Sequence, residues 1–414
     1  MLKLSQLPPA RRRDVCNQCH YQPSHLIAGI RRFGRGDYSY QPGQELSSYR
    51  LEVDLDEEGK LSAERFEINH HAYRLEQSAC FLQSNDELEC VTCHDPHRRV
   101  NRQPEHYRNV CRSCHDSQDK ACSRGDGVAQ TDPAGDQGNC VSCHMPKRRA
   151  QDVVRATVTD HRIQRASEID WTRQLRETAP TVKSVEIVGG TQLSDVERRV
   201  YSSVASTRLL GEAEPVSRLL GLLGTYPADQ PEPYHDLALG LVRVRRYDQA
   251  KEILQLLDSR WPDFPLTKDW LALVESISGR SVQAVELLRA AVAESQRPES
   301  IFNLARLLAG GGVLEEARSL FEEAVRLRPG MQSAEFQIGR MLMDQAEFGE
   351  AEKHFLRSLC MDPLYARSYL GLAEALFEQD KIGEAIAWLK LGEGLVRQAD
   401  TISQQIRILR AELP

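Results

Sequence analysis

The most regular feature of the chain is a hydrophobic pattern that recurs with a period of about 34 residues in its second half. Each copy has a small residue, followed four positions later by a large apolar residue. The small residues are Ala250, Ala284, Ala317, Ala351 and Ala385, and the large ones are Leu254, Leu288, Phe321, Phe355 and Leu389. In three copies a proline stands twelve positions after the small residue, at Pro262, Pro329 and Pro363. Proline ends a helix because it lacks the backbone N–H.

This spacing predicts pairs of antiparallel helices that stack upon one another. The small residue lets the two helices of a pair cross closely, and the large residue fills the next contact. A weaker copy comes first, with Val216, Leu220 and Pro227. We therefore predict about six helix pairs over residues 196–395, the first degenerate, and a capping helix over 396–414.

The period and pattern resemble tetratricopeptide repeats. The resemblance implies a superhelical solenoid that holds a protein partner, here a redox partner protein. Asn303 and Arg306 are candidate polar contacts for an extended peptide. Two other uses of the solenoid are packing against the N-terminal part and assembly with a second copy.

Residues 1–165 show no such period. Here we predict loops, short helices and one β-hairpin, with strands at 49–55 and 62–69 on either side of the turn sequence DEEGK. Residues 166–195 contain Pro180 and a Gly-Gly pair, which predict a linker with some helix. The predicted fold class is mainly α, with a loop-rich N-terminal domain followed by an α-α superhelical solenoid.

Composition points to chemistry in the N-terminal part. Ten of the 11 cysteines and ten of the 12 histidines lie between Met1 and His161. The formal net charge of -7 argues against a strongly basic nucleic-acid-binding surface. No run of about 18 apolar residues occurs, so we expect no membrane span.

Four copies of the motif Cys-X-X-Cys-His occupy this part of the chain. The cysteines are Cys16, Cys19, Cys90, Cys93, Cys111, Cys114, Cys140 and Cys143, and the histidines that follow are His20, His94, His115 and His144. In c-type haem attachment the two thiols bond to the porphyrin vinyl groups, and the next histidine ligates the iron. The motifs therefore predict four covalently bound c-type haems.

Two other chemistries use paired cysteines. The spacing between Cys93 and Cys111 suits a zinc ribbon. A four-cysteine zinc site, however, does not require a histidine after each pair. A thioredoxin-like redox site needs one such pair and does not explain four.

The sixth iron ligand of each haem is expected to be histidine. Met145 directly follows His144, so it cannot reach the far side of the same haem. His97 lies three residues past His94 and is expected to ligate a neighbouring haem. The distal candidates are His97, His161, His106, His71, His70 and His25. Because thioether ligation raises the potential of a haem, bis-histidine haems predict low potentials and electron transfer.

The runs RLEQSACFLQSNDELECVTCHDPHRRV, HYRNVCRSCH, CVSCHMPKRRAQDVV and TDHRIQR resemble multihaem c-type cytochromes related to the tetrahaem cytochrome of nitrifying bacteria. Members with C-terminal tetratricopeptide repeats are the most similar. The resemblance covers about residues 14 to 165 and implies closely packed haems. It supports His97, His106 and His161 as ligands. Relatives often carry a histidine where this chain has Arg155.

We therefore expect an electron carrier that docks a protein partner, a role compatible with association with a membrane complex. The haem chemistry implies a periplasmic or other extracytoplasmic location, although the N-terminal stretch before Asp14 lacks the apolar run of a signal peptide. One alternative is a haem oxidoreductase that acts on a small inorganic substrate of the nitrogen oxyanion type. The other is a zinc-binding scaffold protein.

Overall fold

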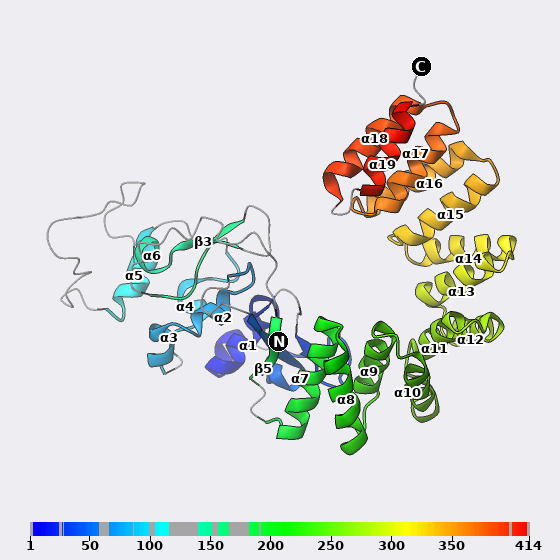
Figure 1. Cartoon of the computed structure of the whole chain (residues 1–414). Helices are drawn as coiled ribbons and strands as arrows, with labels where there is room; N and C mark the ends of the chain where they lie inside the picture. Colours follow the sequence, from blue (N-terminus) through cyan, green and yellow to red (C-terminus); the bar gives the residue numbers. More distant parts are fainter. Residues whose placement is uncertain are drawn as a thin grey trace. The chain divides into compact units, whose positions relative to one another are not determined.

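The computed structural model describes residues 3–24, 27, 29–57, 66–85, 87–98, 104–115, 140–150, 156–164, 182–189, 192–396 and 400–411. The chain divides into two compact units, residues 1–245 and 246–414 (Figure 1). This division falls within residues 196–395, which were predicted as repeats. The domain limits at 165 and 195 remain a prediction.

The N-terminal part of the first unit consists of short helices joined by loops. They are η1 Leu4–Gln6, α1 Pro9–His20, η2 Leu46–Ser48, α2 His71–Leu75, α3 Ala79–Gln83, α4 Cys90–Cys93, α5 Pro104–Arg112 and α6 Cys140–His144. Pro9 begins α1 because its missing N–H would be unpaired in the first turn anyway. Each Cys-X-X-Cys-His motif begins on one of these helices. Helical structure therefore presents the four motifs.

A three-stranded antiparallel sheet supports these helices. Its strands, in spatial order, are β1 Ile30–Arg31, β2 Arg50–Glu57 and β5 Val182–Val188. Alternate residues of β2, namely Leu51, Val53 and Leu55, are buried, as expected for one covered face of a sheet. A second antiparallel pair joins β3 Lys147–Arg149 and β4 Thr157–Thr159.

The strand predicted at 49–55 is confirmed as β2. Strand β1 pairs with its residues Arg50 and Leu51, and β5 pairs with residues 52–57. Of the second predicted strand at 62–69, residues 66–69 form no strand, and residues 62–65 lie outside the described residues. The predicted pairing of 49–55 with 62–69 therefore stays a prediction.

Residues 182–188, within the predicted linker, form strand β5 rather than helix. Their sequence VKSVEIV is rich in β-branched residues, which favour strands. Helix α7 (Asp195–Leu210) covers the outer edge of β5, where the Ser202 hydroxyl donates to the Val185 carbonyl at 2.8 Å. A stacked pair, Phe33 and Tyr201, with ring centroids 4.1 Å apart, also joins α7 to the N-terminal part. Helices α8 (Ala213–Thr225) and α9 (Glu232–Arg243) complete this unit.

The second unit is a stack of helix pairs, drawn from dark green to red in Figure 1. Its helices are α10 Tyr247–Arg260, α11 Thr267–Ile277, α12 Ser281–Glu294, α13 Pro298–Gly310, α14 Leu314–Leu327, α15 Gln332–Asp344, α16 Phe348–Met361, α17 Ala366–Phe377, α18 Ile382–Leu395 and α19 Asp400–Ala411. The predicted pattern is confirmed, because all five small residues and all five large residues of the period are buried. Helices α10, α14 and α16 end just before Pro262, Pro329 and Pro363. The capping helix is α19.

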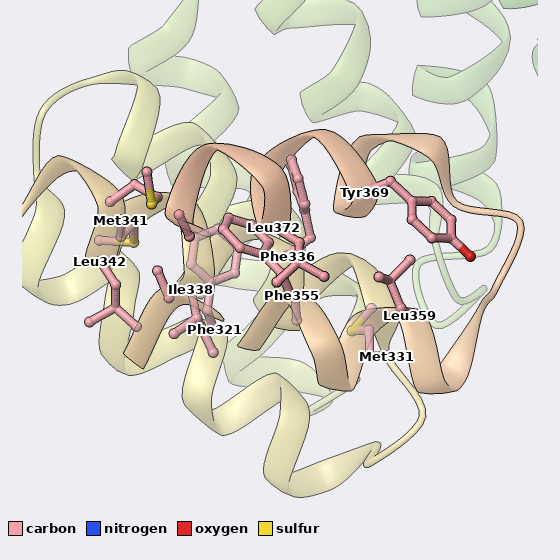
Figure 2. Packing of buried hydrophobic residues seen from close by; sticks show 14 of the residues in the cluster. Phe321, Met331, Phe336, Ile338, Met341, Leu342, Phe355, Leu359, Tyr369 and Leu372 are labelled. Atoms are coloured by element: carbon pink, nitrogen blue, oxygen red, sulfur yellow. The ribbon is translucent and has the colours of Figure 1, made fainter. Parts of the chain in front are cut away.

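Aromatic and aliphatic side chains, Phe355 among them, pack together in the core of this stack (Figure 2). Phe355 of α16 is completely buried, and its ring lies against Gly339 of α15 and Gly371 of α17. A Cβ atom added at either glycine would come within 2.8 Å of the Phe355 ring. Glycine at these two positions is therefore a steric requirement of this packing.

None of the helices in the described residues is both long enough and apolar enough to cross a bilayer.

Candidate functional site

The first two Cys-X-X-Cys-His motifs lie side by side although they are far apart in the chain. The Cys16 and Cys90 thiols are neighbours, and interaction with the Cys90 thiol lowers the pKa of Cys16 to about 7. Arg12, one helical turn before Cys16, donates to both carboxylate oxygens of Glu89 at 2.8 and 2.6 Å. Glu89 is buried and forms the N-cap of α4. This forked ion pair fixes the α1 motif against the α4 motif.

The third and fourth motifs also lie next to each other, on α5 and α6. Burial, together with the neighbouring Cys140 thiol, raises the pKa of Cys111 to about 11. The His106 Nε2–H of α5 donates to the Cys93 carbonyl at 3.1 Å, which joins α5 to the second motif. The described structure includes the backbone of Cys143 but not its side chain. The four motifs are thus arranged as two neighbouring pairs.

Four histidine rings form a row at the centre of this arrangement. The ring centroids of His20 and His71 are 5.7 Å apart, those of His71 and His161 are 4.7 Å apart, and those of His161 and His94 are 6.1 Å apart. His20 and His94 are the proximal residues of the first two motifs. His71 and His161 are two of the distal candidates. His71 is the first residue of α2, and His161 lies two residues after the end of β4.

The two outer distances in this row match those of two imidazoles that share one metal ion. With a metal–nitrogen bond of about 2 Å, two ring centres on opposite sides of a metal lie about 6 Å apart. The His20–His71 and His94–His161 distances meet this requirement. The 4.7 Å distance between His71 and His161 is too short for a metal ion between them and indicates direct ring contact.

The ring nitrogens of these histidines are also suited to metal ligation. His161 Nδ1 donates to the Thr159 carbonyl at 3.1 Å, which leaves its Nε2 for a ligand. Metal-binding histidines usually have such a backbone partner. Buried His71 Nδ1 has no hydrogen-bond partner in the described residues. An orphaned polar atom of this kind indicates a missing ligand.

The electrostatic environment keeps these rings in the form that binds metals. Burial, together with the neighbouring histidines, lowers the pKa of His71 to about 4. Burial also lowers the pKa of His161 and of His94. These shifts favour the neutral form of His71, His161 and His94, and neutral imidazole is the ligand form. The donor set fits two iron sites with two imidazoles each.

His144 of the fourth motif is prepared in a similar way. Its Nδ1 donates to the Gln164 carbonyl at 2.8 Å, and the Gln164 amide donates back to the His144 carbonyl. His115 of the third motif is exposed, and among the described residues no second imidazole contacts its ring. In the described residues, His20 and His94 thus have a second histidine ring nearby, and His144 has a backbone hydrogen bond. His115 has no second imidazole beside it there.

The remaining distal candidates differ from this group. His70 is buried, but its Nδ1 accepts from the Glu67 amide at 3.3 Å and its Nε2 lies 3.1 Å from the Pro23 carbonyl. Both of its ring nitrogens are therefore occupied. His97 and His106 are exposed on the surface of the described part. His25 lies outside the described residues.

Sequence reasoning missed the residues that hold this site together. They are Arg12, Glu89, Arg74, Arg148 and Asp160. Partners in these ion pairs lie up to 86 residues apart, so spacing along the chain gives no signal for them. The described residues contain no group of three or more His, Cys, Asp or Glu side chains arranged to hold a metal ion.

The second unit matches a known repeat family. The family model described as "Tetratricopeptide repeat" matches residues 272–332 and 336–399, all of them in this unit. These residues are tetratricopeptide repeats.

Other proteins share similarity with parts of the chain. A segment of 120 residues is 33% identical to the probable biofilm formation methyltransferase WspC of Pseudomonas putida. That segment is 27% of this chain, and the chain spans only 28% of the length of that relative. Among solved structures, YrrB, a TPR protein with an unusual peptide-binding site, is 16% identical with a TM-score of 0.36, and the match covers 49% of this chain and all of YrrB. TTC0263 of Thermus thermophilus, a thermophilic TPR protein, is 20% identical with a TM-score of 0.37, over 44% of this chain and 99% of that one.

The candidate peptide contacts in the repeats differ from each other. Asn303 donates to Asp269 at 3.1 Å, so it is already used in an internal bond. Arg306 of α13 is exposed and makes no ion pair or hydrogen bond in the described residues. Arg340 occupies the equivalent position of the next repeat, where it pairs with Glu374 at 2.6 Å. Arg306 therefore remains the candidate for a partner contact.

Proposed function

We propose that this protein is a multihaem c-type cytochrome that transfers electrons through four covalently bound haems. The tetratricopeptide repeats give it a protein-interaction role, and we propose that the partner they dock is a redox protein. The observation that carries the electron-transfer proposal is the row of four histidine rings. Two of these rings belong to attachment motifs, and two come from elsewhere in the chain.

The residues of the chain have distinct roles in this proposal. Cys16, Cys19, Cys90 and Cys93 would hold the first two haems by thioether bonds. His20 and His71 would then hold the iron of one haem, and His94 and His161 the iron of another. A haem supplies a one-electron couple when bound, and two imidazoles leave no iron position open to substrate. The contact between His71 and His161 would bring the two sites close together.

The other two motifs would hold the third and fourth haems. The bond from His144 Nδ1 to the Gln164 carbonyl fixes the ring of His144, which would ligate one of these two irons. His97 and His106 stay as distal candidates for these two sites, together with His25. Covalent haem attachment would imply a periplasmic or other extracytoplasmic location.

The attachment is tested by counting haems. We expect the full chain, expressed in a periplasm that matures c-type cytochromes, to show four haems per chain by pyridine haemochrome and by intact mass. Replacing both Cys16 and Cys19 by serine should remove one haem. Cys80→Ser is the matched control, because Cys80 is a half-buried cysteine outside the motifs, and it should keep all four. Fewer than one haem in the natural sequence rejects the proposal.

The docking role is tested separately. Arg306→Glu reverses an exposed charge that has no internal partner, so it should weaken binding of the partner without loss of helical content. Arg326→Glu is a suitable control, because Arg326 is an exposed arginine on α14 whose only contact in the described residues is a surface pair with Glu323. Equal affinity of the two variants for the redox partner would contradict a docking role for Arg306.

One observation favours a second function, reduction of a small inorganic substrate. His115 is exposed, and no other imidazole lies beside it among the residues that the structure describes; His25 lies outside them. An iron held by His115 would then have an open position. Rapid binding of carbon monoxide to one reduced haem of four would support this enzyme. No binding at any haem would leave the electron carrier.

A further inference from the structure

A buried ion pair lies directly beside the histidine row. Asp160 is completely buried, and Arg74 is 1% exposed. Arg74 Nε and Nη2 donate to the two carboxylate oxygens of Asp160 at 2.9 and 2.7 Å. A bidentate guanidinium–carboxylate pair fixes both the distance and the angle between its two residues, because both groups are planar and rigid.

Both residues of this pair are close in sequence to a histidine of the row. Arg74 lies three positions after His71 on the same helix, α2, and Asp160 directly precedes His161. The Asp160 backbone is also held, since its amide donates to the Pro146 carbonyl at 2.9 Å. Its carboxylate accepts from the Arg162 amide at 2.9 Å and from Arg148 Nη1 at 3.1 Å. Asp160 is therefore a fixed anchor.

The elements that carry these histidines cannot be placed by their own backbone bonds. Helix α2 has five residues and strand β4 has three. Helices this short are marginal without tertiary contacts. The side-chain pair that joins them thus sets where His71 lies relative to His161, whose rings are 4.7 Å apart.

We propose that Arg74 and Asp160 are positioning residues, which hold His71 and His161 in contact as the distal ligands of two neighbouring haems. The inference rests on the proposed function and adds to it the device that sets the geometry of both axial pairs. Neither residue is proposed to touch an iron.

Loss of any buried ion pair destabilises a protein, so a positioning role needs a matched control. The same unit contains one. Arg208 donates from Nε and Nη2 to both oxygens of Asp236 at 2.7 Å each, and Asp236 is 5% exposed. This second fork joins α7 to α9, whereas the first joins α2 to the residues after β4. The two pairs share the forked geometry, although the Arg208 side chain is 41% exposed and that of Arg74 only 1%. They also differ in what lies beside them.

The experiment compares Asp160→Asn and Arg74→Lys with Asp236→Asn in the full, haem-loaded chain. Electron paramagnetic resonance of the oxidised protein reports the axial ligand geometry of each low-spin haem, and pyridine haemochrome reports the number of haems. We expect all three variants to keep four haems. In the Asp160→Asn and Arg74→Lys variants the g values of two haem signals should shift, or a high-spin signal should appear. Asp236→Asn should keep the natural spectrum although its unfolding midpoint falls.

Several results decide the matter. If the spectrum is unchanged in both Arg74→Lys and Asp160→Asn, the positioning role is overturned. A count of four haems in the same samples would still support the proposed cytochrome function. The same spectral change in Asp236→Asn also overturns it, because the effect would then be general loosening. If Asp160→Asn does not fold, Arg74→Lys decides alone, since it keeps the positive charge and loses only the fork. A colourless natural protein overturns the proposed function and this inference together.

Discussion

Gly392 of α18 offers the sharpest test of the packing argument in the repeats. It is buried against the face of the Tyr369 ring, and a Cβ atom added there would lie 2.7 Å from Tyr369 Cγ. The ring cannot turn away easily, because it is 2% exposed and its hydroxyl donates to the Pro363 carbonyl at 3.0 Å. Gly394, two residues further along the same helix, has open space where its Cβ would stand. We expect Gly392→Ala and Gly394→Ala to have opposite effects on stability.

The magnitude follows from two opposing terms. Alanine is more favourable than glycine in a helix by up to about 1 kcal/mol, and this gain applies at both positions. Overpacking of a core costs about 1–3 kcal/mol, and this cost applies only at Gly392. The two variants should therefore differ by about 2 kcal/mol in the free energy of local unfolding, which is about a 30-fold difference in the opening equilibrium.

Native-state hydrogen exchange of peptides from α17 and α18 measures this difference directly. Peptides from α11 and α12 serve as the internal control, because each repeat contacts only its neighbours. We expect faster exchange in α17 and α18 of Gly392→Ala than of Gly394→Ala, and no change in α11 and α12. Equal protection in the two variants would show that the Tyr369 ring moves freely, which would refute the steric argument.

Three further predictions concern single side chains. Burial raises the pKa of Glu52 from 4.5 to about 7, so between these pH values the folded chain keeps a proton that the unfolded chain has lost. Stability should then fall by up to about 3 kcal/mol as pH rises through that window, and Glu52→Gln should abolish this slope in urea unfolding at pH 5 and pH 8. Phe355→Ala should cost about 3–5 kcal/mol through the cavity it leaves, seen as lost exchange protection in α15 to α17; protection like that of the natural chain would contradict the buried contact. Ser194→Ala removes the side-chain cap of α7 and should cost about 1 kcal/mol, with faster exchange confined to its first turn, whereas an unaffected first turn would contradict the cap.

The repeats could be predicted from sequence because their contacts are local. Ala317 and Phe321 lie one helical turn apart and are both buried, and Pro329 marks where α14 has ended. Because the same local pattern recurs in several copies, a helix boundary that is misassigned in one repeat can be corrected from the others.

The sheet could not be predicted in the same way. The sequence around 50–57 indicates a strand, but nothing local shows that Val182–Val188 pairs with it. The strand signal in VKSVEIV was also present, although Pro180 and the two glycines after it favoured a linker. Pairing between strands that are distant in sequence depends on the whole fold, so the spacing of residues along the chain does not indicate it.

The candidate site falls between these cases. The motifs name His20 and His94 directly, because chemistry fixes their place after the second cysteine. Spacing could only offer His71 and His161 among six candidates, and it could not distinguish His71 from the adjacent His70. The structure separates the two, since the His70 ring nitrogens are occupied while His71 Nδ1 has no partner in the described residues.

The pairing of β2 with β5 also bears on the order in which parts of the chain fold during synthesis. Three of the four cysteine motifs lie in residues 58–181, the segment that this pairing closes into a loop. Closing so long a loop is entropically costly and slow compared with forming local helices. During synthesis the cysteines from Cys90 to Cys143 emerge before Val182–Val188 exists. An enzyme that attached haem to these cysteines during synthesis would therefore meet an open chain, before β5 completes the sheet.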